Sequence, residues 1–155
     1  MPNFWMLVVT PENFSITRER GFKVQGVEGR HRRKVRRMLP GDRVLYFVAG
    51  SRRFAATATV ASTYREDHTP IWKGPPPEDY PLRVNIRPEV VLEEGDWVDA
   101  RELGPTLEYV RKWPPESWPL AFQGNMHLLS QRDFRLIEEE MRKVSEGRQE
   151  QTASV

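Results

Sequence analysis

The pattern of hydrophobic and polar residues is most regular between Met38 and Ser62, where it predicts a β-hairpin. Val44 to Val48 is an unbroken run of apolar side chains, several of them β-branched or aromatic, and Phe54 to Val60 returns as an alternating strand. Between them, Ala49 to Arg53 has the residue types of a turn. Because the first arm is apolar on both faces, we expect it to be a central strand that is covered from both sides.

Two further strands and a helix follow from the same kind of pattern. Phe4 to Thr10 is a continuous apolar run that predicts a buried strand, and Leu82 to Glu93 alternates, with a bulge or an edge position expected at Pro88. A helix is predicted directly after the first strand. Thr10 suits its N-cap, and Gly21 suits its left-handed end.

The chain is expected to close with a helix that begins at Ser130. Its apolar residues fall on one face at helical spacing, and they are Phe134, Ile137, Met141 and Val144. From Ser145 onwards the residues are polar and have nothing to bury, so we expect a domain over residues 1–144 and a disordered tail over residues 145–155.

The segments between these elements are less regular. Arg30 to Arg37 predicts a short basic helix, and Asp99 to Val110 a second short helix. Tyr64 to Tyr80 and Trp113 to Pro119 are rich in proline, which predicts two stiff loops. Leu120 to Leu129 is expected to contain the last strand.

Composition indicates one globular domain without metal or disulfide chemistry. The 155 residues are 38% hydrophobic and 30% charged, which suits a single core with a charged surface. The absence of cysteine excludes disulfides, thiol catalysis and zinc–thiolate sites, and the three histidines lie too far apart for a metal-binding spacing. No apolar run is long enough for a membrane helix, so we expect no membrane partner and a cytoplasmic protein.

Positive charge gathers in one part of the chain. The net charge is only +2, but nine Lys and Arg residues stand against two Glu residues between Arg18 and Arg37. Acidic residues gather later, in Glu93 to Asp96 and Glu138 to Glu140. An uneven distribution of this kind favours an anionic partner.

Several short motifs, in order, resemble those of the EVE domain. The motifs are Phe4-Trp5, Pro11-Glu12-Asn13, Arg30-His31-Arg32, Pro40-Gly41-Asp42, Tyr80-Pro81-Leu82-Arg83-Val84 and the ending from Ser130 to Met141. The resemblance implies an α+β fold, a PUA-like mixed β-barrel with packed helices in a single domain, related to YTH domains. It also implies a non-enzymatic reader of a modified cytosine or adenine in DNA or RNA.

The resemblance implies a pocket at the barrel mouth into which such a base is flipped. Asn13 matches the position at which YTH-like relatives place an Asn on the base edge, and Gln25 falls where they carry a Trp of their aromatic cage. Trp72 or Tyr80 is expected to form the stacking wall. The expected pocket residues are Trp5, Asn13, Phe22, Gln25, Gly26, Trp72, Tyr80 and Met126. The alternatives are structural: Asn13 as a helix-start residue, Trp72 as a lid on the barrel, and Phe22 as a core anchor.

The basic run supplies candidates for phosphate binding. The residues expected to contact phosphates are Arg30, Arg32, Arg33 and Arg36. The alternative is a solvated helix face. We expect no cofactor, and we expect the protein to act as a monomer.

Two other function classes stay open at this point. His68 beside Asp67 suggests a general base with its orienting carboxylate, as in an amidohydrolase of the ASCH branch of the PUA-like group acting on modified nucleosides. The hydrophobic loop from Trp113 to Trp118 suggests a protein-interaction module.

Overall fold

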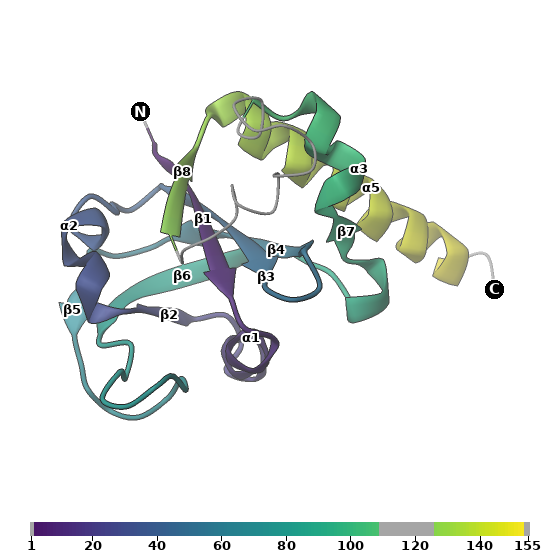
Figure 1. Ribbon diagram of the computed structural model, residues 1–155. Coiled ribbons are helices and arrows are strands. Elements are labelled where there is room, and N and C mark those ends of the chain that lie inside the picture. The colour runs from purple at the N-terminus through teal and green to yellow at the C-terminus, as the bar shows by residue number, and fades with distance from the viewer. Residues whose placement is uncertain (1, 109–125, 154–155) are drawn as a thin grey trace.

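The computed structural model of the chain describes residues 2–108 and 126–153, which form a curled, mixed sheet with helices on both faces (Figure 1). The elements are β1 (Phe4–Val9), α1 (Pro11–Glu19), β2 (Val24–Val27), η1 (Gly29–His31), α2 (Arg32–Val35), β3 (Arg43–Val48), β4 (Arg53–Val60), β5 (Arg65–Glu66), β6 (Leu82–Val91), η2 (Glu94–Asp96), β7 (Val98–Asp99), α3 (Ala100–Leu103), η3 (Gly104–Thr106), β8 (Met126–Leu129) and α5 (Gln131–Ala153). The expected α+β architecture, a mixed sheet with packed helices in a single domain, is confirmed.

The sheet runs in the order β2-β6-β4-β3-β1-β8, with β5 paired to β6 and β7 paired to β4. β1 and β3 are parallel, and the other pairs are antiparallel. In the described ranges β2 and β8 do not pair with each other, so the sheet is a half-barrel rather than a closed one. Lys34 of α2 donates to the carbonyl oxygen of Met126 at 2.8 Å, which ties α2 to β8.

The central position expected for the first arm of the hairpin is confirmed. β3 lies between β1 and β4, and its side chains alternate between two hydrophobic cores. Tyr46 belongs to the core that α1 and α2 cover, whereas Leu45 and Phe47 belong to the core that α5 covers. A β-bulge falls at Pro88 as well, where the register of β4 and β6 shifts.

The predicted helix caps are present. The Thr10 hydroxyl accepts from the backbone N–H of Asn13 at 3.1 Å, and Gly21 has a φ of +79°. The Ser130 hydroxyl accepts from the N–H of Asp133 in the same way at 3.1 Å. These caps satisfy backbone groups that the first turn of each helix leaves unpaired.

Helix α5 is longer than expected. The helix continues to Ala153, and so runs through most of the stretch 145–155 for which the sequence predicted a disordered tail. Phe134, Ile137 and Met141 pack on the sheet as predicted, and the last turns extend beyond it (Figure 1). Once a packed segment has nucleated a helix, adding residues with good helix propensity requires little further ordering, and Glu, Gln and Arg dominate this extension.

Some expectations fall on residues that the structure does not describe. The loop from Trp113 to Pro119 and residues 120–125 of the predicted last strand lie outside the described residues, whereas Met126 to Leu129 do form β8. Within residues 2–108 and 126–153, no helix is long and apolar enough to cross a membrane.

Candidate nucleic-acid interface

A cavity of about 60 Å³ lies where β1 ends and α1 begins. Its other walls come from β2 and from the proline-rich loop that precedes β6. Five of the eight expected pocket residues line this cavity: Asn13, Gln25, Gly26, Trp72 and Tyr80. They come from three segments that are far apart in the sequence, so the fold itself brings them together.

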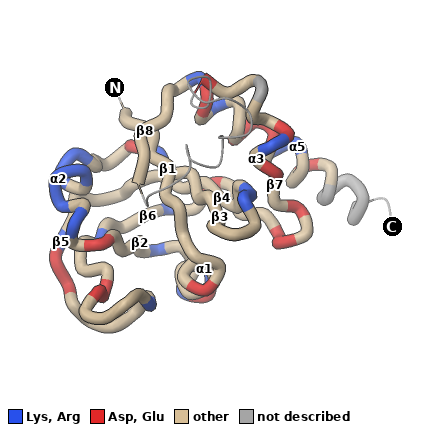
Figure 2. The backbone as a smooth tube through the Cα atoms, viewed as in Figure 1, with Lys and Arg blue, Asp and Glu red and all other residues tan. Residues whose placement is uncertain are grey.

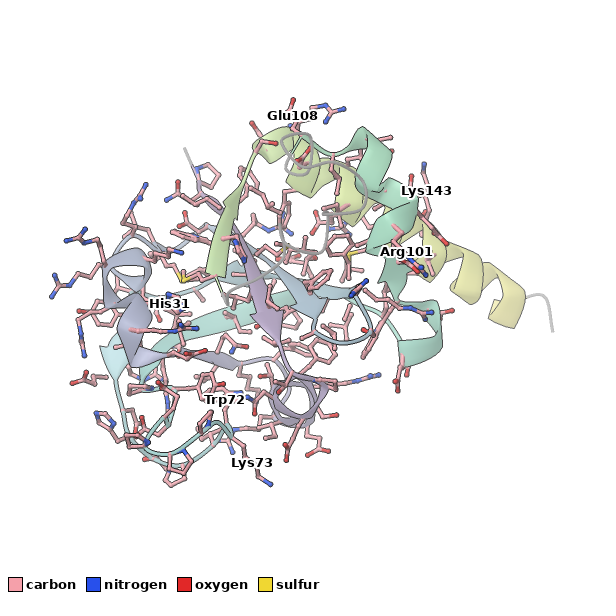
Figure 3. All side chains as sticks on the ribbon, viewed as in Figure 1. His31, Trp72, Lys73, Arg101, Glu108 and Lys143 are labelled. Carbon is pink, nitrogen blue, oxygen red and sulfur yellow. The ribbon has the colours of Figure 1, made fainter. Side chains whose placement is uncertain are left out.

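Asn13 connects the start of α1 to the proline-rich loop through hydrogen bonds. Its Nδ2 donates to the carbonyl oxygen of Lys73 at 2.8 Å, and its Oδ1 accepts from the N–H of Lys73, also at 2.8 Å. Figure 3 shows Lys73 and Trp72 on this loop, next to α1. The amide is therefore held in one orientation, with a remaining hydrogen-bonding capacity at the cavity.

Gln25 lies in a buried hydrogen-bond network. Its Oε1 accepts from the Tyr46 hydroxyl at 2.8 Å and from the Thr17 hydroxyl at 3.3 Å, and its Nε2 donates to the Gly26 carbonyl at 2.7 Å. Burial raises the pKa of Tyr46 far above its ordinary value, so its hydroxyl stays a donor. The side chain expected to reach a base edge is thus occupied in the core.

Trp72 forms the rear wall of the cavity and is only 4% exposed. Its Nε1 donates to the Thr17 hydroxyl at 2.8 Å, which joins it to the Gln25 network. Gly26 lies so close that a Cβ there would be 2.4 Å from the Trp72 ring. The Arg83 guanidinium lies 5.2 Å from the ring centroid, so Trp72 is packed between neighbours.

Tyr80 is the more accessible aromatic residue of the cavity. Its φ of +52° lies in the left-handed region, which disfavours residues with a Cβ. Two contacts hold that backbone, since the Tyr80 N–H donates to Glu78 Oε1 at 2.8 Å and its carbonyl accepts from Arg83 Nε at 3.2 Å. Burial, followed by the Glu28 and Glu78 carboxylates, raises the pKa of the Tyr80 phenol, and a hydrogen bond with Asn13 opposes this rise.

Arg83 is buried and donates hydrogen bonds to the proline-rich loop. The sequence did not indicate this role. The alternation of β6 placed it on the polar face, yet its side chain is only 1% exposed. Besides Tyr80, its guanidinium donates to the carbonyl oxygens of Thr69 and Asp79 and lies 3.5 Å from Asp67. Three carbonyls of one loop thus depend on a single side chain. The signal available in the sequence was a cation on a strand that follows a long proline-rich loop.

Three expected pocket residues belong to the core instead. Trp5 is fully buried, and its Nε1 donates to Asp42 Oδ2 at 3.0 Å. Phe22 packs against Phe14 and Tyr46, with ring centroids 5.6 and 5.9 Å apart. Met126 is 1% exposed in the same core. Each is buried between the sheet and its covering helices and does not line the cavity.

The four expected phosphate-binding arginines lie on and beside α2 (Figure 2). Arg30 and Arg32 have acidic partners, because Arg30 pairs with Glu28 at 2.8 Å and Arg32 pairs with Glu66. Arg33 and Arg36 are exposed and, among the described residues, have no carboxylate partner. Of the four, these two are the most available to an anion.

The Asp–His pair suggested by the sequence does not form. His68 Nδ1 lies 2.7 Å from Asp79 Oδ2 rather than next to Asp67, whose carboxylate accepts from the Thr69 N–H. The His68 side chain is 63% exposed and does not line the cavity. Within the described residues, no group of His, Asp or Glu side chains has the arrangement of a metal site.

Related proteins have been identified from sequence and structure. A UPF0310 protein of Pyrococcus abyssi is 28% identical over 146 residues, which cover 88% of this chain and 97% of that protein. The Mmi1 YTH domain in a complex with RNA has a TM-score of 0.63 at 10% identity, and the match covers 95% of this chain and 82% of that one.

Two other solved structures have the same fold. The YTH domain of the Zygosaccharomyces rouxii MRB1 protein, in a complex with N6-methyladenosine RNA, has a TM-score of 0.63 at 18% identity over 89% of this chain and 85% of that one. A hypothetical protein from Leishmania major also has a TM-score of 0.63 at 18% identity, over 96% of this chain and 98% of that one. The sequence profile of the EVE domain matches residues 3–112. This chain therefore belongs to the EVE domain family.

Proposed function

We propose that this chain is a non-enzymatic nucleic-acid-binding module that takes one modified base of DNA or RNA into the cavity at the end of β1. The observation that carries the proposal is the Asn13 amide, which two 2.8 Å hydrogen bonds to Lys73 hold at the cavity wall. A polar group fixed before the ligand arrives loses little entropy on binding. The folds shared with two RNA-bound YTH domains support the choice of ligand class.

Tyr80 is the proposed stacking partner, and Trp72 the wall behind it. A cavity of about 60 Å³ is much smaller than the roughly 300–1,000 Å³ of pockets that enclose a whole small molecule, so it suits the polar edge of a base rather than a whole nucleotide. The ring of the base then lies at the cavity mouth, where the partly exposed Tyr80 is available. Stacking on an aromatic ring contributes about 1–3 kcal/mol and tolerates any base.

The arginines on and beside α2, called the basic face from here on, are proposed to contact the nucleic-acid backbone. They are Arg30, Arg32, Arg33 and Arg36. Arg30 links this face to the cavity, because it pairs with Glu28, which lines the cavity. Phosphate contacts position a nucleic acid, whereas contacts to base edges select the sequence or the modification. Arg33 and Arg36 would therefore contribute affinity, and Asn13 selectivity.

The test is a binding panel measured by fluorescence anisotropy. Single-stranded and duplex oligonucleotides of DNA and RNA, each with one modified or unmodified base, are titrated with the parent protein, Tyr80→Phe and Tyr80→Ala. Tyr80→Ala is expected to weaken binding of all bases by about 5- to 100-fold through lost stacking, whereas Tyr80→Phe keeps the ring and most of the affinity. If the parent binds no member of the panel, or if Tyr80→Ala binds like the parent, the proposed site is wrong.

A further inference from the structure

One wall of the cavity carries an acidic group. Glu28 directly follows β2 and lines the cavity, and its side chain is only 14% exposed. Its Oε2 accepts from Arg30 Nε at 2.8 Å, whereas its Oε1 has no hydrogen-bond partner among the residues that the structure describes. A carboxylate can accept at both oxygens, so Glu28 retains an acceptor for a ligand.

The surroundings of Glu28 place its charge at the cavity. The carboxylate is one of the groups that raise the pKa of the Tyr80 phenol, and Tyr80 lines the same cavity. Arg30 is 63% exposed and contacts Glu28 through one nitrogen, so it orients the carboxylate without enclosing it. The nearby side-chain acceptor of the cavity, Asn13 Oδ1, already accepts one hydrogen bond from the Lys73 N–H and is neutral, whereas Glu28 is an acid.

We infer that Glu28 is a specificity-determining residue, and that its Oε1 accepts a hydrogen bond from the exocyclic amino group of the bound base. This inference rests on the proposed function. It selects the amino-bearing bases, cytosine, adenine and their methylated derivatives, over the keto bases uracil, thymine and hypoxanthine. An ionised carboxylate cannot donate, so a keto oxygen in the same place would leave two acceptors facing each other in a desolvated site.

The test uses pairs of bases that differ in the amino or keto group. Single-stranded oligonucleotides carry 5-methylcytosine or thymine, or adenine or hypoxanthine, at one central position. The parent is expected to bind the amino member of at least one pair about tenfold more tightly. Glu28→Gln, which has the same shape and can donate, is expected to reduce that preference to less than about threefold.

Glu66→Gln is the matched control. Glu66 pairs with Arg32 as Glu28 pairs with Arg30, but it does not line the cavity. Both variants remove one negative charge and the ion-pair partner of one arginine, so both should show any general effect of charge on affinity. Only Glu28→Gln should lose the preference for amino over keto bases. Thermal unfolding of each variant and of Glu28→Ala checks that the fold is retained.

The possible outcomes separate this inference from the proposed function. If the parent binds through Tyr80 but does not distinguish amino from keto bases, or if Glu28→Gln keeps the tenfold preference, the role of Glu28 is wrong and the base-binding site stands. If the parent binds none of these probes, the inference about Glu28 fails, and the wider panel described above decides the proposed function.

Discussion

Asn13 and Lys73 are joined by a reciprocal pair of hydrogen bonds, in which the Asn13 amide pairs with both the N–H and the carbonyl of Lys73 at 2.8 Å. The two residues are 60 positions apart. Since Asn13 lies in the first turn of α1 and Lys73 in the proline-rich loop, this contact sets the distance between two walls of the cavity. The Asn13 side chain therefore stabilises the loop and is also a candidate contact for a base.

The Asn13→Ala variant should reveal both roles. Loss of the amide leaves two backbone groups of Lys73 without their partner, which should lower the free energy of unfolding by about 1–3 kcal/mol. Binding of a modified oligonucleotide should weaken, and the discrimination between modified and unmodified bases should decrease. Urea denaturation and fluorescence anisotropy measure the two effects.

Ser130→Ala is the control for Asn13→Ala. It removes the N-cap hydrogen bond of α5 and should lower the free energy of unfolding by a similar 0.5–2 kcal/mol, roughly. Since α5 covers the other core, binding should be unchanged. Equal losses of binding in both variants would mean that stability, and not the Asn13 contact, controls affinity.

Gly26→Ala should disturb the rear wall of the cavity. An added Cβ would lie 2.4 Å from the Trp72 ring and 2.8 Å from the Tyr80 carbonyl oxygen, so the ring or the loop must move. We expect a loss of about 1–3 kcal/mol in the free energy of unfolding and a change in Trp fluorescence. Gly95→Ala is the control, because nothing lies within 4 Å of a Cβ at that position. An unchanged stability of Gly26→Ala would contradict the tight packing of Trp72.

Arg83→Met should loosen the proline-rich loop. The variant keeps much of the apolar stem but loses the donors to the Thr69, Asp79 and Tyr80 carbonyls, which should raise hydrogen exchange in the loop and destabilise the protein by about 1–3 kcal/mol. Arg87→Met, on the same strand with a 68% exposed side chain, should have little effect on either quantity. Equal exchange in the two variants would exclude Arg83 as the organiser of the loop.

If the basic face binds phosphates, the affinity for an oligonucleotide should depend on the salt concentration. Replacing Arg33 and Arg36 together by Ala should weaken oligonucleotide binding, and each lost phosphate contact should reduce the slope of log K against log salt by about 0.7–0.9. The control is the double variant Arg135→Ala plus Arg142→Ala, which removes the same charge from α5. Identical slopes in the two double variants would show that only net charge matters.

His31 should make stability depend on pH near neutrality. Burial, with help from Arg30 and Lys34, lowers the pKa of His31 below its ordinary value of 6.5. Between the lowered value and 6.5 the unfolded chain binds more protons than the folded one, so the free energy of unfolding should decrease as the pH falls through this window.

Denaturation midpoints between pH 7 and pH 5.5 test this dependence. His31→Gln should flatten the pH dependence, whereas His68→Gln, which removes a 63% exposed imidazole, should retain it. A slope that survives in His31→Gln would assign the dependence to another group.

The sequence predicted the elements better than it predicted the partners of polar side chains. The hairpin strands, the caps at Thr10 and Ser130 and the apolar face of α5 depend on residues close in sequence, and the structure confirms all of them. Gln25 was assigned to the pocket through the resemblance to YTH-like cages, and Arg83 to the polar face of its strand because the strand alternates. Their burial depends on partners that only the folded chain supplies.

Gln25 is the clearest example among the site residues. Its position was interpreted through the Trp of YTH-like cages, but its amide bonds with Thr17 and Tyr46, eight and 21 residues away. No local pattern encodes such a three-residue contact. The proximity of Asn13, Gly26, Trp72 and Tyr80 was predicted only through the resemblance to EVE domains, and the cavity that they line agrees with it.

The parallel pairing of β1 with β3 has a consequence for how a ligand acts on the whole molecule. Parallel neighbours require a crossover, and here α1, β2 and α2 all lie between the two strands. The cavity wall at the end of β1 thus exists only when residues far apart in sequence have already assembled. A base bound there should protect the protein from global unfolding by RT ln(1 + [L]/Kd), about 2.7 kcal/mol at a ligand concentration 100 times Kd. A rise in melting temperature would then report occupancy of the cavity without any label.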